Sequence, residues 1–563
     1  MNSLDTRTRS KRLQDAAELS KESPFDLLVI GGGATGAGIA LDSISRGMST
    51  VLLEKVDFAW GTSSRSTKLI HGGLRYLKQL DVGLVREVGR ERAIVHRNAP
   101  HIAHPEELLL PIVENGSLGK YSTPVGLWVY EKLAGVKKDE RFYSLDKREA
   151  LVQEPLLNER VVRGGAIYRE YRTDDARLVT CLAKTASKQG ASLFNYTKVT
   201  SFIYEAEQVV GVRLRDEIGK KELELFARTI INAAGPWCDE VRSMDTKVSG
   251  KRLQLTKGSH LVFSQKRFPI KRAVYFDVRS DERMVFAIPR GGCTYLGTTD
   301  TLYQRDIDNP RTSASDVDYL LAAANHMFPG LKLTAADVES TWVGLRPLIH
   351  EDGKGPTELS RKDEIFNSKS GLISIAGGKL TGYRIMAERA VDQAMATLTA
   401  MGGSKFKDSR TEEITLDGGD FAHYSEVSTY KERLLGEGDQ ISLSVDWVHH
   451  LVDTYGKSAQ DIVERAYELH PVEQDPERRM LRAEVEYSVE CEACASLCDF
   501  LIRRTGRLYF QRPALAELYP LAADLMATHL GWTDEQKRIQ ILDFESEYEA
   551  VMSWQEEYAG ISS

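Results

Sequence analysis

The chain has 563 residues, of which 42% are hydrophobic and 28% charged, and its formal net charge is −8. These values are typical of a soluble globular protein with one to four domains, and the acidic balance argues against general nucleic-acid binding. Six cysteines are too few for a disulfide scaffold, which favours a reducing compartment. We expect no signal peptide, because residues 1–24 lack an apolar core, and no stretch is long enough to predict a membrane span.

The first 54 residues divide into a polar arm and a nucleotide-binding unit. Residues 1–24 are mixed in charge, and we expect a frayed or loosely docked arm. The unit then runs from an apolar strand at 27–30 through a glycine-rich turn into a helix at 37–46. A second apolar strand at 50–53 ends in Glu54. This order predicts a dinucleotide site, with the pyrophosphate at the helix start and a ribose hydroxyl at the acid.

The turn carries the three glycines that such a site requires, Gly31, Gly33 and Gly36. The first permits the tight turn, the second lets the pyrophosphate approach the backbone, and the third lets the helix pack close to the strand. The spacing by itself fits either NAD or FAD. Two further strand–glycine turns, at 232–235 and 376–379, lie far downstream and favour FAD, because they suit a cofactor site assembled from the whole chain.

The middle of the chain alternates helical and strand-like patterns. Residues 59–76 combine hydroxyls, glycines and basic groups, which predicts a ligand-facing loop. Helices are expected at 83–98, 176–189, 313–327 and from about 381, and strands at 192–235, 252–300 and 372–376.

Residues 445–550 have helical periodicity and few strand signals, so we expect a separate helical C-terminal domain. Cys491, Cys494 and Cys498 recur at helical spacing, which favours one packed helix face over a metal site, and no metal is predicted. The basic cluster at 503–507 is expected to be a solvated face, with contact to anionic lipid as the alternative.

Seven separated motifs resemble, in the same order, the FAD-dependent glycerol-3-phosphate dehydrogenase family. They are S-S-R-S-T-K-L-I-H-G-G-L-R-Y-L at 63–77, A-G-P-W at 234–237, K-G-S-H at 257–260, G-T-T-D at 297–300, G-L-R-P-L at 344–348, G-G-K-L-T-G-Y-R at 377–384 and D-F-L-I-R-R-T at 499–505. The resemblance implies that glycerol 3-phosphate loses a hydride from C2 to the flavin, giving dihydroxyacetone phosphate, and that a membrane quinone then accepts the electrons.

A phosphate-ester substrate needs converging cations, and oxidation of its hydroxyl needs a base. The candidates for the catalytic machinery are His71, His260, Arg346 and Lys379, and the choice of base between the two histidines stays open. The resemblance places the substrate at Arg75, Tyr76, His260, Arg346, Arg361 and Lys379.

The motifs and the resemblance together give the predicted cofactor contacts. These are Gly31, Gly33, Ala34, Thr35, Gly36, Glu54, Lys55, Thr62, Ser63, Ser64, Lys68, Leu69, His71, Gly72, Gly73, Val199, Ala233, Ala234, Gly235, Trp237, Gly344, Arg346, Gly378, Lys379, Leu380 and Thr381. The helix that starts near Thr381 is expected to direct its N-terminal dipole at the flavin.

The expected fold is α/β, with a glutathione-reductase-type FAD domain at 25–405 and an all-helical domain at 406–563. The FAD-binding parts are about 25–105, 176–240 and 340–400, and an inserted antiparallel-sheet substrate cap takes about 106–175 and 241–339. We expect a cytoplasmic enzyme of glycerol catabolism, peripheral on the inner face of the cytoplasmic membrane, with a homodimer as an option and no nucleic-acid partner. The alternatives are an oxidase that uses oxygen, or an FAD oxidase of another hydroxy acid or an amine.

Overall fold

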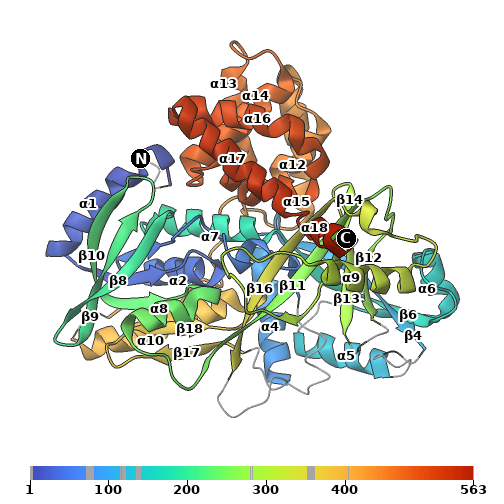
Figure 1. Cartoon of the computed structure of the whole chain (residues 1–563), viewed down its shortest axis with the longest axis horizontal. Coiled ribbons are helices and arrows are strands. Elements are labelled where there is room, and N and C mark those ends of the chain that lie inside the picture. The colour runs from blue at the N-terminus through green and yellow to red at the C-terminus, as the bar shows by residue number, and fades with distance from the viewer. Residues whose placement is uncertain are drawn as a thin grey trace.

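The computed structural model describes residues 4–71, 82–114, 116, 122–134, 141–278, 281, 283–350, 362–402 and 405–561. Two sheets form the body of the molecule, and the C-terminal helices sit on top of it in the view of Figure 1. In its described part the chain therefore has the α/β architecture predicted from the sequence, with a helical C-terminal region.

The first sheet has the strand order β17-β18-β10-β1-β2-β7, with β8 and β9 continuing β10 as an antiparallel ribbon. β18, β10, β1, β2 and β7 run parallel, and β17 is antiparallel to β18. Its strands are β1 (Phe25–Ile30), β2 (Thr50–Leu53), β7 (Ser192–Phe194), β8 (Thr197–Glu205), β9 (Gln208–Asp216), β10 (Lys221–Asn232), β17 (Glu364–Asn367) and β18 (Ile373–Ala376). The parallel strands β1, β2, β7 and β18 are short and mostly apolar, and β10 is apolar and buried in its last part, where it pairs with β1, as expected for strands covered on both faces.

The second sheet is mostly antiparallel and has the order β15-β11-β14-β13-β12-β4-β6-β3, with β16 on β11 and β5 on β6. Its strands are β3 (Leu69–Ile70), β4 (His104–Val113), β5 (Tyr143–Leu145), β6 (Val162–Arg172), β11 (Arg252–Ser264), β12 (Ala273–Asp277), β13 (Met284–Arg290), β14 (Cys293–Gly297), β15 (Thr301–Leu302) and β16 (Ser340–His350). The C-terminal helices pack against this sheet, as one continuous apolar cluster contains residues of both.

Helices cover the sheets and form the C-terminal region (Figure 1). Those of the body are α1 (Arg9–Glu22), α2 (Ala34–Ser45), α4 (Val82–Asn98), α5 (Ser122–Ala134), α6 (Lys147–Gln153), α7 (Asp175–Lys188), α8 (Cys238–Asp245), α9 (Ala314–Met327) and α10 (Tyr383–Ala400). Those of the C-terminal region are α11 (Ser425–Glu437), α12 (Val445–Tyr455), α13 (Ala459–Leu469), α14 (Pro476–Cys491), α15 (Arg507–Phe510), α16 (Arg512–Leu530), α17 (Asp534–Ala550) and α18 (Trp554–Ile561). Short helical turns are η1 (Thr6–Thr8), η2 (Thr62–Ser64), η4 (Gly235–Trp237), η5 (Ala335–Asp337), η7 (Leu380–Gly382), η8 (Gly438–Ile441), η9 (Gly456–Ser458) and the π-helical η10 (Asp499–Arg504).

The N-terminal segment differs from the frayed arm expected from its charges. Residues 9–22 form α1, which packs against β10 through Leu13 and Ala17. Arg9 is only 1% exposed and forms an ion pair with Asp216. The local charge pattern could not predict this ion pair, because Asp216 lies about two hundred residues away in the chain.

Two expectations about the C-terminal region are also wrong. The basic cluster is buried: Arg503 and Arg504 pair with Asp57, and Arg507 pairs with Glu484. The three cysteines do not share one helix, because α14 ends at Cys491. Within the described part of the chain, no three His, Cys, Asp or Glu residues are grouped in a way that would hold a metal ion.

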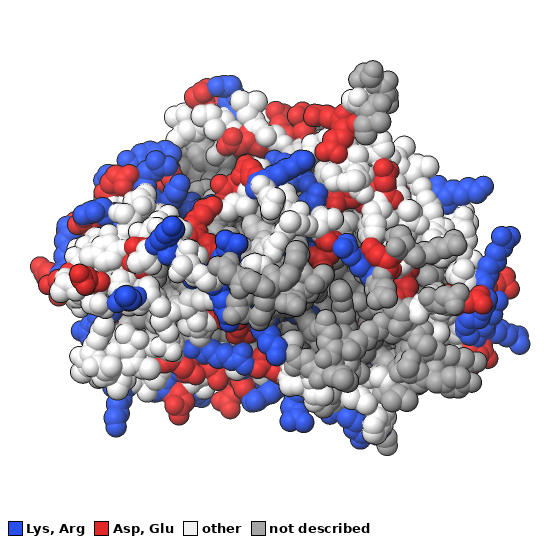
Figure 2. Space-filling model, turned by 60° about the horizontal axis from the view of Figure 1, so that its bottom comes forward, with Lys and Arg blue, Asp and Glu red and all other residues white. Residues whose placement is uncertain are grey.

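Two further properties of the described residues bear on the partners. No helix among them has the length and the apolar character needed to cross a membrane. On the face drawn in Figure 2, lysine and arginine side chains are interspersed with aspartate and glutamate.

Candidate active site

A cavity of about 470 Å³ opens between the two sheets. One wall is formed by residues directly after β1, β2, β10 and β18, so it lies at the carboxyl ends of the parallel strands. The other wall is formed by β6, β11, β12, β13 and β16 of the second sheet. A crevice outside the carboxyl ends of parallel strands is where open α/β sheets bind their ligands.

The glycine-rich turn after β1 is fixed by close backbone contacts. Gly31 has φ +111°, and a Cβ on it would lie 2.6 Å from the Ala233 carbonyl oxygen. A Cβ on Gly36 would overlap the Gly31 carbonyl, so α2 reaches this strand only because Gly36 has no side chain. Gly33 is the N-cap of α2 and has no side-chain capping bond. The start of α2 therefore presents backbone to the cavity.

Glu54 lies at the end of β2 and lines the cavity. Its carboxylate accepts hydrogen bonds from the backbone N–H of Gly32 at 2.7 Å and of Val56 at 3.0 Å. Burial raises the pKa of the Glu54 carboxyl, and the two N–H donors offset part of that rise. The side chain thus links the glycine turn to the loop that follows β2.

Most predicted cofactor residues line the cavity. They are Gly31, Gly33, Ala34, Thr35, Glu54, Lys55, Thr62, Ser63, Leu69, His71, Val199, Ala233, Ala234, Gly235, Trp237, Gly344, Arg346, Gly378, Lys379, Leu380 and Thr381.

Gly36, Ser64 and Lys68 lie behind the cavity wall. The Lys68 ammonium is buried and donates to Asp175 Oδ1 at 2.5 Å and to the Ser64 carbonyl at 3.1 Å. This buried position indicates that Lys68 stabilises the cavity wall from behind and does not face the cavity. Gly72 and Gly73 are outside the described residues.

His260, on β11, is buried and lines the cavity. Its ring stacks on Trp342 with 4.5 Å between centroids and an interplanar angle of 8°. Nε2 lies 3.0 Å from Thr67 Oγ1, and which of the two donates depends on the tautomer. Burial, followed by the positive charge of Arg346, holds the pKa of His260 well below its ordinary value. The imidazole is therefore neutral at neutral pH.

Arg346, on β16, points its guanidinium over Gly258 of β11. One terminal nitrogen donates to the Thr299 carbonyl at 3.2 Å and to Asp300 Oδ1 at 3.3 Å, and the other donates to Thr298 Oγ1 at 3.1 Å. A methyl group on Gly258 would overlap the guanidinium. The group is thus held in place and keeps 29% side-chain exposure toward the cavity.

The register of β11 and β16 puts His260 and Arg346 on one face. His260 pairs with Trp342, Gly258 with Gly344, and Thr256 with Arg346. Directly paired residues in antiparallel strands point the same way, so His260, Gly258, Gly344 and Arg346 all line the cavity. The Arg346 guanidinium lies over Gly258, and the Arg65 carbonyl lies over Gly344, so the two glycines make room for these groups. The imidazole and the guanidinium thus share one wall of the cavity, which suits a small molecule with a reactive group at one end and an anion at the other.

The remaining predicted residues divide into two groups. His71 and Lys379 line the cavity, and the His71 carbonyl accepts from Thr381 Oγ1 at 3.2 Å. Arg75, Tyr76 and Arg361 lie outside the described residues.

Three contributors to the site were missed in the residue assignments from sequence. Thr67 bonds to His260, Asp300 pairs with Arg346, and Trp342 supports the imidazole by stacking. Thr67 and Asp300 lie within motifs recognised above, so the motifs were the signal. Trp342 precedes its motif by two residues, and only the strand register brings it under His260.

Comparisons with known proteins agree with this geometry. The family model for FAD-dependent oxidoreductases matches residues 26–384, and the model for the C-terminal domain of alpha-glycerophosphate oxidase matches residues 409–537. The aerobic glycerol-3-phosphate dehydrogenase of Bacillus subtilis is 48% identical over 91% of this chain and 92% of its own length. That of Staphylococcus saprophyticus is 46% identical over 94% of each chain.

A solved structure is also similar over nearly the whole chain. The glycerol-3-phosphate dehydrogenase from Bacillus halodurans, complexed with FAD, is 42% identical and aligns with a TM-score of 0.83 over 98% of this chain and 99% of the other. L-alpha-glycerophosphate oxidase from Mycoplasma pneumoniae aligns with a TM-score of 0.55 over 69% of this chain and 97% of its own, at 17% identity, which indicates a shared fold.

The fold, the cavity and the family model define an FAD-dependent oxidoreductase. Within that class, the chain belongs to the aerobic glycerol-3-phosphate dehydrogenase family. The residues present suit FAD. The start of α2 lines the cavity, with the Ala34 N–H donating to Ser63 Oγ at 3.0 Å, and its dipole favours a pyrophosphate. Glu54 offers a carboxylate to a ribose hydroxyl.

Proposed function

We propose that the protein oxidises glycerol 3-phosphate to dihydroxyacetone phosphate. The observation that supports the proposal is that a neutral imidazole, His260, and a guanidinium held in place, Arg346, lie on the same wall of the cofactor cavity. Arginine suits a phosphate monoester because its planar fork matches the oxygens. The names of the relatives supply the particular substrate.

In this mechanism Arg346 binds the phosphate and so orients the substrate, while His260 accepts the proton of the C2 hydroxyl. When bound, FAD supplies the two-electron acceptor for the hydride from C2. Burial is the main cause of the lowered pKa of His260, and the charge of Arg346 comes second, so a substrate dianion beside Arg346 would offset part of the lowering. Binding would therefore raise the basicity of the imidazole at the moment a base is needed. His71 remains the alternative base, because it lines the same cavity.

The predicted contacts of the cofactor fit this scheme. We assign the glycine turn and Glu54 to the dinucleotide, and the turn from Gly378 to Thr381 to the flavin, where the start of α10 would stabilise negative charge. Lys379 is assigned to the substrate pocket along with Arg346.

For the electron acceptor we propose a membrane quinone, which would place the enzyme in glycerol catabolism on the inner face of the cytoplasmic membrane, with a homodimer as an option. Oxygen is the second candidate, and it is favoured by the match of residues 409–537 to a domain described from an oxidase.

Anaerobic mixing of the flavin-loaded protein with glycerol 3-phosphate tests the substrate. Bleaching of the flavin absorbance is the expected result, and a quinone analogue or air added afterwards identifies the acceptor by the faster return of colour. An unbleached flavin would overturn the substrate assignment and point to another hydroxy acid or an amine.

Arg346→Ala should raise the KM for glycerol 3-phosphate roughly ten- to a hundredfold, because a charge-assisted bond contributes about 1.5–3 kcal/mol. The matched control is Arg311→Ala, which removes a similarly exposed arginine that pairs with Glu547. A KM for the Arg346 variant within twofold of wild type, with flavin retained, would contradict its role.

A further inference from the structure

The loop after β2 forms one end of the cofactor cavity. Glu54 and Lys55 line the cavity before its bend, and Trp60 lines it after the bend. Backbone hydrogen bonds hold the loop. Ala59 N–H donates to the Gly32 carbonyl at 3.0 Å and Trp60 N–H to the Asp57 carbonyl at 3.1 Å, while Tyr196 N–H donates to the Val56 carbonyl at 2.5 Å and Thr197 N–H to the Glu54 carbonyl at 2.7 Å. The loop thus lies between the glycine turn and the start of β8.

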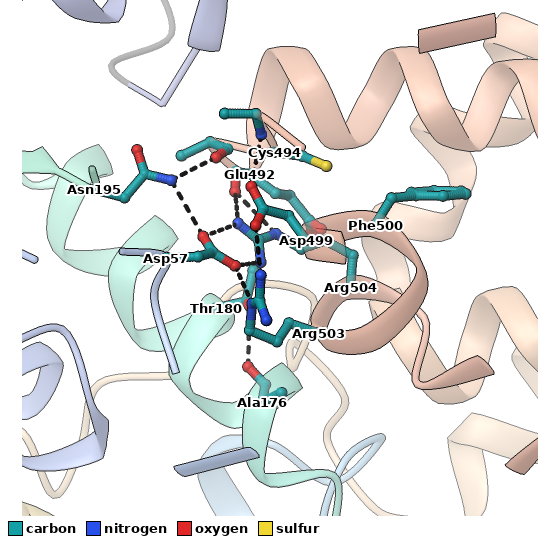
Figure 3. Close-up of polar contacts among 12 residues, drawn as sticks. Asp57, Ala176, Thr180, Asn195, Glu492, Cys494, Asp499, Phe500, Arg503 and Arg504 are labelled. Atoms are coloured by element: carbon teal, nitrogen blue, oxygen red, sulfur yellow. Dashed lines mark hydrogen bonds and ion pairs between the residues drawn. The ribbon is translucent and has the colours of Figure 1, made fainter. Parts of the chain in front are cut away.

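Asp57, at the bend, is fully buried and is held by the C-terminal region (Figure 3). Arg504 donates one terminal nitrogen to each carboxylate oxygen, both at 2.8 Å, which is the bidentate geometry. Arg503 Nε donates to Oδ2 at 2.5 Å, and Asn195 Nδ2 donates to Oδ1 at 3.1 Å. No other carboxylate on this loop receives two arginines in the described part of the chain.

The same region of the C-terminal helices also contacts the connection between β7 and β8, beside the loop. Asn195 also donates to the Ala493 carbonyl at 2.8 Å, and the Tyr196 hydroxyl donates to Asp499 Oδ1 at 2.7 Å. Asp499 in turn accepts from Arg503 at 2.5 Å. Residues 197–199, which follow at once, line the cavity. Both segments at this end of the cavity are therefore tied to residues 493–504.

The guanidinium of Arg504 is fixed on its own side as well. Its Nε and one terminal nitrogen donate to the Glu492 carbonyl at 3.0 and 2.7 Å. The side chain is fully buried, and η10 carries it on a π-helical turn, which places consecutive arginines toward one carboxylate. The arginines therefore hold the loop from a rigid element.

We propose that Arg503 and Arg504 are positioning residues for FAD, through which the C-terminal helical region completes the cofactor site by holding the loop that carries Glu54. The two arginines do not line the cavity, so they act through Asp57. This inference rests on FAD binding and is independent of the substrate proposed above.

The test is the dissociation constant of FAD for the full-length apoprotein, followed by flavin fluorescence below the unfolding temperature. Arg504→Met should raise this dissociation constant at least tenfold. Arg504→Lys should restore part of the FAD affinity, since a lysine keeps the positive charge but cannot form the bidentate pair with a carboxylate. The matched control is Arg479→Met. Arg479 is also buried, and it donates to the carbonyls of Glu473, Gln474 and Ile441, which all belong to the helical region.

Arg479→Met should change the FAD dissociation constant less than twofold, while it lowers the Tm by as much as Arg504→Met does. With saturating FAD, the KM of the Arg504 variant for glycerol 3-phosphate should stay within twofold of wild type. An Arg504→Met protein that binds FAD as wild type does, or an Arg479→Met protein that loses it equally, overturns the proposal. If Arg504→Met does not fold, Asp57→Asn takes its place, and unchanged FAD affinity in that variant overturns the proposal as well.

Discussion

Gly31→Ala should both destabilise the protein and weaken FAD binding. The φ of +111° is unfavourable for any residue with a Cβ, at a cost of about 1–3 kcal/mol. The new methyl would also lie 2.6 Å from the Ala233 carbonyl oxygen and 2.9 Å from its carbon. Because both are backbone atoms of the residue directly after β10, the turns that follow β1 and β10 must separate, which adds about 1–3 kcal/mol.

The sum, about 2–6 kcal/mol, predicts a Tm lower by roughly 2–8 °C. FAD affinity should fall as well, since the turn assigned to the pyrophosphate is displaced from Ala233. Gly436→Ala is the matched control, because a Cβ there meets nothing within 4 Å and the residue lies in α11. That change should be neutral or stabilising by up to about 1 kcal/mol. Differential scanning fluorimetry and flavin fluorescence measure both effects. A Gly31→Ala protein that keeps its Tm within 1 °C and its FAD affinity within twofold would refute the reasoning.

Two further predictions concern buried charge. Lys68→Met should destabilise the protein by about 3–5 kcal/mol, because it leaves the buried Asp175 carboxylate without its cation. Lys21→Met, which removes an exposed ion pair, should cost less than about 1 kcal/mol. Thermal unfolding compares the two variants, and equal shifts in Tm would contradict the prediction for Lys68. His101 is fully buried, and burial lowers its pKa to about 3. Below pH 6.5 this histidine binds a proton in the unfolded chain but not in the folded protein. Between pH 7 and pH 5 the free energy of unfolding of wild type should therefore fall by about 2 kcal/mol more than that of His101→Gln. Urea unfolding measures both, and parallel pH profiles of the two proteins would contradict the prediction.

Local sequence was sufficient for the nucleotide-binding unit. The predicted strand at 50–53 is β2, and the predicted helix at 37–46 overlaps α2 from Ala34 to Ser45. The determinants lie close together in the chain: short apolar runs, glycines that a turn requires, and an acid after the second strand. For the same reason the motifs located His260 and Arg346 in the cavity, although their common face follows only from the register of β11 and β16.

The errors arose where a charge has a partner far away in the chain. Arg9 and Arg504 occur among other charged residues, a pattern that usually marks a solvated surface. Their partners are Asp216, the last residue of β9, and Asp57, in the loop after β2, and no sequence spacing links these residues to the arginines. Lys68 is a similar case. Its motif correctly predicted a position near the cavity, but the ion pair with Asp175 directs the ammonium behind the cavity wall. Pairing between distant segments is a property of the tertiary structure.

The bond between Asp57 and Arg504 joins residues 447 positions apart, and this separation has a consequence during synthesis. At about 5–20 residues per second, a ribosome needs roughly 20–90 s to travel from the codon of one to the codon of the other. During that interval the residues of the glycine turn have been synthesised, but the two arginines that pair with Asp57 have not. A chain that stops or is cut before η10 would contain the glycine fingerprint and lack both cations of the Asp57 carboxylate.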